Sequence, residues 1–149
     1  MKQKLLEQSV FTSVFHLSNK LQAEGDKLSN ELTLKQWFLL LLLYKGHIKN
    51  PTVNDLALEM GVTRQSMKKM VDILEKNGYL SVEKSSSDSR ALCISPTTKA
   101  YDFFQKNKLL GKMLLNKVFS GITQDELTTV LWVLQKMQTN LQAAGEADE

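Results

Sequence analysis

Cysteine is almost absent from the sequence: Cys93 is the one cysteine among 149 residues. A single thiol forms no disulfide within the chain and supplies no multi-cysteine metal site, a pattern typical of proteins in a reducing compartment. The two histidines, His16 and His47, also lack metal-ligand spacing. We therefore expect a cytoplasmic protein that holds no metal and no other cofactor.

Long apolar runs are absent as well. The longest extends from Trp37 to Tyr44 and has eight residues, whereas a helix that spans a bilayer needs roughly 20. The N-terminal residues 1–8 contain no apolar core of a signal peptide. The sequence therefore predicts neither a membrane span nor secretion.

No catalytic constellation is recognisable in the chain. A nucleophile, a general base and an orienting residue do not occur together in a known motif. Cys93 lies in an alternating segment without a neighbouring histidine, so a structural thiol is favoured over a redox switch. We expect the chain not to be an enzyme, and we assign no catalytic residue.

Helical periodicity accounts for most of the chain. Apolar residues recur at helical spacing over residues 4–24, and Gly25 follows. Thr33 is placed to cap a second helix, which extends to about Lys45 and is apolar on nearly all sides. With 42% hydrophobic residues, a chain of this length buries a core of ordinary size.

The next segment is the most informative. Thr52 is an N-cap with Asp55 three residues on, and Gly61 is placed to end this short helix in the left-handed conformation. Thr63 caps a longer helix that reaches about Asn77. Two helices joined by a tight turn that contains glycine form a helix-turn-helix unit.

A β-hairpin is expected after this unit. Residues 79–84 and 90–94 alternate in polarity, and the serine-rich residues 85–89 form a turn between them. The sequence therefore predicts a mostly α fold with a small β-hairpin wing.

Two further helices are expected after the wing. The helical period returns at Thr97 and predicts the first of them. A capping box of Thr123 with Glu126 opens the last helix, which extends to about Leu141. We expect residues 143–149 to be frayed.

Basic residues are unevenly distributed, although the net charge is only +3. Residues 61–97 carry six Lys or Arg against four acids, and residues 98–121 carry five Lys against one acid. Residues 122–149 reverse this ratio, with five acids and one Lys. A polyanion would therefore lie away from the C-terminal end, although ordinary solvated charge explains the distribution about as well.

Three stretches carry a resemblance to known proteins: residues 32–37 (LTLKQW), residues 71–80 (VDILEKNGYL) and residues 88–97 (DSRALCISPT). They resemble the start of the second helix, the end of the recognition helix and the wing of the MarR family of bacterial regulators. The wing, with its Asp-x-Arg followed by an apolar strand, is the most specific. Pro96 stands where the family usually has Leu, and Ala100 where Gly often follows, so we expect a local difference after the wing.

The resemblance implies a winged helix-turn-helix fold. Residues 1–30 and 98–149 form the dimerisation helices, and residues 31–97 form the DNA-binding region of one intertwined domain. The implied homodimer places one recognition helix in each major groove of double-stranded DNA. We therefore expect a sequence-specific transcriptional regulator that binds a pseudo-palindromic operator and is relieved by a small-molecule effector.

The sign of regulation and the partner leave alternatives. A repressor is favoured, because occlusion of a promoter requires only tight DNA binding. The alternative function is a winged-helix module that binds a partner protein and does not bind DNA.

The candidate DNA contacts lie on the recognition helix and the wing. The helix N-terminus favours phosphate, while Gln65 and a basic residue reach base edges; a merely solvated helix face is the alternative. On the wing, Arg90 is expected in the minor groove with Asp88 orienting it, and a surface ion pair is the alternative. The predicted set is Thr63, Arg64, Gln65, Ser66, Lys68, Lys69, Lys84, Ser86, Asp88 and Arg90.

His16 and Trp37 are candidate effector-binding residues. The resemblance implies an effector cavity between the dimer helices and the DNA-binding part, and these two side chains are placed to line it. The alternative is that both are ordinary core residues.

Overall fold

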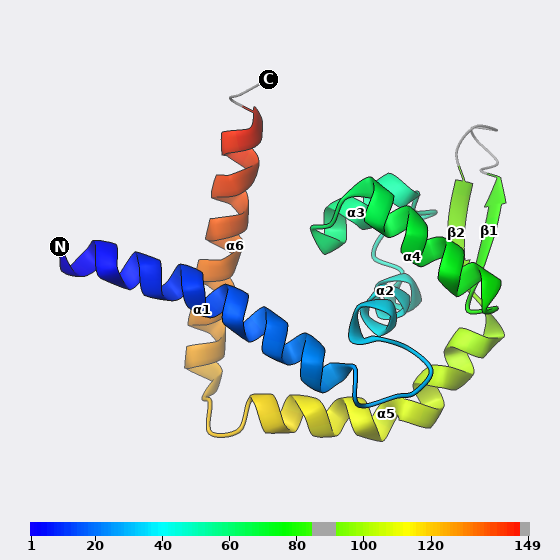
Figure 1. The fold of residues 1–149 in the computed structure, drawn as a ribbon, viewed down its shortest axis with the longest axis horizontal. Helices are drawn as coiled ribbons and strands as arrows, with labels where there is room; N and C mark the ends of the chain where they lie inside the picture. Colours follow the sequence, from blue (N-terminus) through cyan, green and yellow to red (C-terminus); the bar gives the residue numbers. More distant parts are fainter. Residues whose placement is uncertain (85–91, 147–149) are drawn as a thin grey trace. The chain divides into compact units, whose positions relative to one another are not determined.

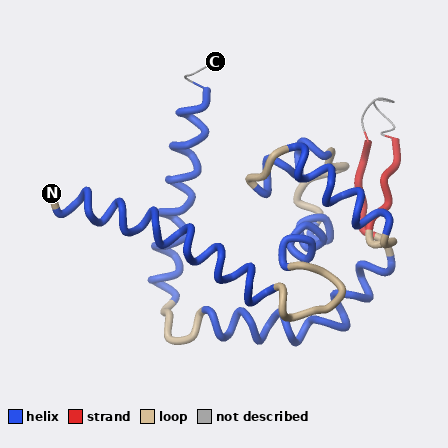
Figure 2. The backbone as a smooth tube through the Cα atoms, viewed as in Figure 1, coloured by secondary structure: helices blue, strands red, loops and turns tan. Residues whose placement is uncertain are grey.

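The computed structural model describes residues 1–84 and 92–146, and these ranges contain six helices and one two-stranded antiparallel sheet (Figure 1). The elements follow in the order α1 (Lys2–Gly25), α2 (Leu34–Lys45), α3 (Val53–Met60), α4 (Arg64–Lys76), β1 (Leu80–Lys84), β2 (Leu92–Pro96), α5 (Thr98–Val118) and α6 (Gln124–Glu146). Figure 2 shows how far helix exceeds strand in the described part. The predicted mostly α fold with a small hairpin is confirmed.

The chain divides into two compact units, Met1–Gly111 and Lys112–Glu149. The first contains α1 to α4, the sheet and most of α5, and the second contains the end of α5 and all of α6. Every residue of the described hydrophobic core lies in the first unit. Among the described helices, none combines the length and the apolar character that a membrane crossing requires.

Local capping sets the starts of α2 and α3. At α2, the Thr33 side chain accepts a hydrogen bond from the Gln36 backbone N–H (3.2 Å), and the Gln36 side chain accepts one from the Thr33 N–H (3.0 Å). At α3, Thr52 and Asp55 form the same reciprocal pair, at 3.3 and 2.8 Å. Each box satisfies two backbone donors that have no partner within the helix. The predicted caps Thr33 and Thr52 are confirmed.

The turn between α3 and α4 depends on Gly61, which has φ of 64°. This is the left-handed conformation that glycine adopts without steric cost. Two residues later the Thr63 side chain accepts a hydrogen bond from the Ser66 N–H (3.1 Å) and starts α4. The predicted helix-turn-helix unit is therefore present with its predicted boundaries.

The core lies between this unit, α2, the start of α5 and the base of the hairpin. On α4, Met67, Val71 and Leu74 are buried and Met70 is partly buried. The spacing of three and four residues places them on one side of the helix. The buried hydrophobic residues are Leu32, Leu39, Leu40, Leu43, Leu56, Ala57, Met67, Val71, Leu74, Tyr79, Leu80, Ile94, Ala100 and Phe103.

The hairpin strands pair with Leu80 opposite Pro96, Val82 opposite Ile94 and Lys84 opposite Leu92. The second strand was expected at 90–94, and it extends two residues further because Ser95 and Pro96 still pair with β1. Proline, which has no N–H to donate, is tolerated at such a strand end. Residues 85–91, which include the predicted turn, lie outside the described residues.

The last helix starts at the expected capping box. Before α6, the Thr123 N–H donates to Glu126 Oε2 (2.8 Å) and the Glu126 N–H donates to Thr123 Oγ1 (3.3 Å). The α6 helix then continues to Glu146, so the expected end at about Leu141 and the expected fraying are wrong for residues 143–146. Gln142, Ala143 and Ala144 favour helix and carry α6 past Leu141, and the helix also includes Gly145.

Candidate nucleic-acid interface

The outer face of α4 is polar and basic. Met67, Val71 and Leu74 are buried in the core, so the side chains on the opposite side of α4 point outward. Arg64, Gln65, Lys68 and Lys69 are all exposed. Amphipathic patterning thus exposes a strip of hydrogen-bonding and cationic side chains along the second helix of the helix-turn-helix unit.

This face forms one wall of a groove of about 1070 Å³, which we call the α4 groove. Residues from the start of α3 and Leu92 from β2 also line it, so helix, helix and hairpin meet there. Figure 1 shows α3 and the hairpin flanking α4. The lining residues are Thr52, Val53, Asn54, Arg64, Gln65, Lys68, Lys69, Asp72, Ile73, Lys76 and Leu92.

The α4 groove has a positive balance of charge. Its described lining contains Arg64, Lys68, Lys69 and Lys76, and it contains one carboxylate, Asp72. Asp72 Oδ1 forms an ion pair with Lys68 Nζ, one helical turn away. The two side chains remain 52% and 54% exposed, so both are accessible to a ligand in the groove.

The predicted contact residues fall into three groups. Arg64, Gln65, Lys68 and Lys69 line the α4 groove. The exposed pair Thr63 and Ser66 lies at the start of α4, where the two hydroxyl oxygens are 3.0 Å apart and Thr63 caps the helix.

The remaining predicted contacts belong to the wing. Lys84 is exposed at the end of β1. Ser86, Asp88 and Arg90 lie outside the described residues, so the ion pair between Asp88 and Arg90 stays a prediction.

The predicted contact set leaves out four polar residues that line the groove: Thr52, Asn54, Asp72 and Lys76. Asp72 and Lys76 are seven and eleven positions after Gln65, a helical spacing that places them along the same side of α4. That periodicity was readable from the sequence. Asn54 comes from α3, and only the packing of α3 against α4 brings it to the groove.

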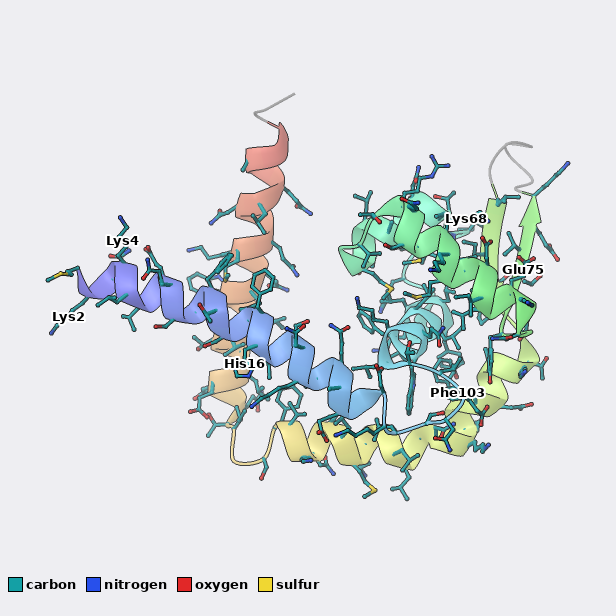
Figure 3. All side chains as sticks on the ribbon, in the orientation of Figure 1. Lys2, Lys4, His16, Lys68, Glu75 and Phe103 are labelled. Atoms are coloured by element: carbon teal, nitrogen blue, oxygen red, sulfur yellow. The ribbon has the colours of Figure 1, made fainter. Side chains whose placement is uncertain are left out.

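The two effector candidates differ in environment. Trp37 is partly buried and packs edge-on against Phe103 with ring centroids 5.1 Å apart. A Cβ on Gly111 would stand 3.3 Å from Trp37 Cζ2, so α5 approaches this indole closely. His16 is exposed on α1 (Figure 3). Trp37 therefore contributes to the core, while an effector role for either residue stays a prediction.

A polar cluster of Tyr79, Glu31 and Lys106 lies just after the end of α4. The Tyr79 hydroxyl donates to Glu31 Oε2 (2.9 Å), and Lys106 Nζ from α5 donates to Glu31 Oε1 (2.7 Å). The hydrogen bond from Lys106 and that from Tyr79 hold the pKa of Glu31 below its usual value. Burial, followed by the bond to Glu31, raises the pKa of Tyr79 to about 12. Lys99 Nζ also lies 4.5 Å from the centre of the Tyr79 ring.

Cys93 is partly buried on β2, and its Sγ lies 3.8 Å from the carbonyl oxygen of Asn50. A thiol in this position packs the hairpin against the loop before α3, in agreement with a structural thiol. Within residues 1–84 and 92–146, no three His, Cys, Asp or Glu side chains gather into a group that would hold a metal ion.

The capped helix-turn-helix unit, the hairpin that follows it and the cationic groove between them define a winged helix-turn-helix protein. Residues 32–92 match the sequence model of the MarR family. This part of the chain, from α2 to the start of β2, is therefore similar to the MarR family.

A relative and two solved structures are similar to the chain. Over 86 residues, or 58% of the chain, it is 30% identical to the HTH-type transcriptional regulator PrsX of Escherichia coli. The matched part is 51% of PrsX, so the chain spans about half the length of this relative.

Sco3205, a MarR family transcriptional regulator from Streptomyces coelicolor whose structure is a complex with DNA, superposes with a TM-score of 0.81. It is 21% identical, and the match covers 93% of this chain and 89% of that one. BpsR of Bordetella bronchiseptica, whose DNA binding is regulated by 6-hydroxynicotinic acid, has a TM-score of 0.74 at 15% identity, with 86% and 91% covered. Both likenesses confirm the fold.

Proposed function

We propose that the chain is a transcriptional regulator that binds double-stranded DNA in a sequence-specific way as a homodimer. The observation that carries the proposal is the α4 groove, in which the outer face of the second helix of a helix-turn-helix unit supplies four cationic side chains. In winged helix-turn-helix proteins this helix is the one that enters the major groove. Sco3205, which has the same fold, was solved in complex with DNA, and this supports DNA as the ligand.

The shape of the groove fits a phosphate strand. With α4 in the major groove and the hairpin over the adjacent minor groove, the strand between the two grooves of DNA passes between helix and hairpin. The α4 groove lies there, between α4 and Leu92 of β2. Lysine and arginine along such a path neutralise phosphates and release counterions, which is the main source of affinity for any sequence.

Base reading is assigned to the first half of α4. We assign Gln65, with Arg64 or Lys69, to base edges, because an amide and a cation match the donors and acceptors of the major groove. Lys68, Thr63 and Ser66 are assigned to the phosphates. On the wing, Lys84, Ser86, Asp88 and Arg90 are assigned to the neighbouring backbone and minor groove.

Self-association is proposed through the first and last helices. Large apolar side chains are exposed on α1, including Phe11 (62%) and Phe15 (61%), and on α6, including Leu131 (58%) and Trp132 (57%). Large apolar side chains exposed in such number on one helix mark a site of association. A second copy of the chain is the occupant that the fold family favours, with residues 1–30 and 98–149 as dimerisation helices around the 31–97 region. A two-fold dimer presents two recognition helices and therefore selects a pseudo-palindrome.

Regulation by a small molecule is the finer part of the proposal. BpsR supports it, since its DNA binding responds to 6-hydroxynicotinic acid. For this chain we propose repression that an effector relieves, with His16 and Trp37 as the residues to test first. Ligand-induced loss of operator binding that is reduced in Trp37→Ala, while Trp37→Ala still binds DNA, would support the assignment.

The central test is selection of duplexes from a random pool, followed by fluorescence anisotropy with the selected duplex over a salt series. We expect enriched half-sites about one helical turn apart and affinity that falls steeply with salt. Selection of duplexes with a single, unrepeated half-site would contradict binding as a dimer. Absence of duplex binding at low salt would favour the module that binds a partner protein.

A further inference from the structure

We propose that Asp72 limits the affinity of the α4 groove for duplex DNA of any sequence by holding Lys68 in an ion pair that a phosphate must break. The proposal rests on the DNA-binding function proposed above. It names a residue that opposes binding, whereas the assignments above name residues that favour it.

The position of Asp72 is the first argument. Its side chain lines the same groove as Arg64, Lys68 and Lys69 and is the only carboxylate in the described lining. It is half exposed, so a phosphate that enters the groove meets a negative charge among the cations. Like charges at this range repel, and salt screens the repulsion.

The ion pair is the second argument. Lys68 Nζ contacts Asp72 Oδ1, so Lys68 reaches a phosphate only after it leaves this carboxylate. Exposed ion pairs are weak, so a phosphate can displace the Asp72 carboxylate from Lys68. Every duplex nevertheless encounters the same cost, whatever its sequence.

A purely structural role for this pair is poorly supported by its orientation. Pairs at a spacing of four residues stabilise a helix best with the acid first, and here the lysine precedes the aspartate. The carboxylate therefore contributes little to the stability of α4.

The test compares Asp72→Asn with Glu75→Gln. Glu75 is exposed on the same helix (Figure 3) and is not among the residues that line the groove. Both substitutions remove one negative charge, so they separate the local effect from net charge. Anisotropy is measured with the selected duplex and with a duplex of scrambled sequence, from low to moderate salt.

We expect Asp72→Asn to bind both duplexes roughly threefold to tenfold more tightly at low salt, with a salt slope steeper by about one because Lys68 gains a phosphate. Glu75→Gln should bind much as the parent does. In a Lys68→Ala background the gain from Asp72→Asn should shrink, since part of it passes through Lys68. Circular dichroism confirms that each variant is folded.

The outcomes separate this proposal from the proposed function. If the parent binds duplex DNA and Asp72→Asn binds equally or more weakly, the role of Asp72 is overturned and the function stands. An equal gain in Glu75→Gln also overturns it, because net charge then explains the effect. If neither the parent nor Asp72→Asn binds any duplex at low salt, both proposals fail.

Discussion

The helix-turn-helix region and the long helices α1 and α6 bury their apolar side chains to very different extents. In α2 and α4, Leu39, Leu40 and Leu74 have no exposed surface. In α1, Phe11 is 62% exposed, and in α6, Trp132 is 57% exposed. All of these residues recur at helical spacing, so the sequence pattern alone does not separate them.

The same helical spacing of apolar residues therefore occurs both in helices that are buried within the chain and in helices that expose their apolar side chains. Around α3 and α4, the apolar face is covered by the same chain, and the region has a complete core. Along α1 and α6, taken separately, large apolar side chains of the described residues are exposed, which is the condition under which a second copy gains most by docking. The stability of the helix-turn-helix region should not depend on protein concentration, whereas the stability of α1 and α6 should depend on it.

The largest expected effect is in the core. Leu40→Ala, at a fully buried position of α2, should lower the free energy of unfolding by about 2–5 kcal/mol, because it removes buried methyl groups and leaves a cavity. Urea unfolding at two protein concentrations should give the same loss. Leu6→Ala, at a 65% exposed position of α1, is the contrast and should cost much less within the chain. Equal losses of unfolding free energy in Leu40→Ala and Leu6→Ala would contradict the difference in packing between the helix-turn-helix region and α1.

The next effect concerns self-association. Leu131→Glu places a charge on the exposed apolar face of α6. We expect the dissociation constant of the dimer to rise at least tenfold, which corresponds to a loss of about 1.4 kcal/mol or more of association free energy. Analytical ultracentrifugation provides the measurement. Asn140→Asp adds the same charge at an exposed polar position nine residues further along α6, on the opposite side of the helix from Leu131, and should leave the dimer intact. A Leu131→Glu protein that dimerises like the parent would refute assembly through α6.

The third effect separates base reading from charge within the α4 groove. Gln65→Ala should relax sequence preference at one base pair by roughly 1–3 kcal/mol, because it removes a side-chain amide from the major groove. Lys68→Ala should weaken binding to all sequences and lower the salt slope by about one. Competition with duplexes mutated at single positions measures both. If both variants lose affinity uniformly, Gln65 does not read a base.

The smallest effect concerns the cluster of Tyr79, Glu31 and Lys106. Tyr79→Phe removes the hydrogen bond to Glu31 and should cost about 1 kcal/mol at neutral pH. The pKa of Tyr79 is raised to about 12, so the folded state favours the neutral phenol. That contribution is complete below the ordinary pKa of 10 and is lost as the pH rises from there to about 12.

Urea unfolding between pH 9 and 12 checks this prediction. The difference in stability between the parent and Tyr79→Phe should narrow as the pH rises. The pKa of Glu31 is lowered, so its contribution is present above its ordinary pKa of 4.5 and is lost as the pH falls through the folded-state value. A difference that stays constant across the alkaline range would show that the phenol does not titrate as proposed.

Helix boundaries were predictable where local chemistry sets them. Thr33, Thr52 and Thr63 cap helices with partners three residues away, and Gly61 ends α3 through its own backbone. The end of α6 was missed, because no glycine or proline at Leu141 breaks a stretch of good helix formers. Boundaries without a cap signal are therefore the ones that sequence places poorly.

The candidate interface was predictable only in part. Gln65, Lys68 and Lys69 follow from the amphipathic pattern of α4, and so would Lys76 have done. Asn54 enters the groove through packing between helices. The bond between Tyr79 and Glu31 joins residues 48 positions apart, and no periodicity relates such positions.

The loop before α3 has one further consequence for the hairpin. The Ile94 N–H of β2 donates to the carbonyl oxygen of Pro51 (3.2 Å), so this loop covers part of the outer edge of β2. An uncovered strand edge is a template on which another chain can add a strand. Because Pro51 and Ile94 are 43 residues apart in sequence, their contact forms only when a long loop closes. A nascent or partly unfolded chain therefore offers β2 to its neighbours until this contact closes, and aggregation should begin at that edge.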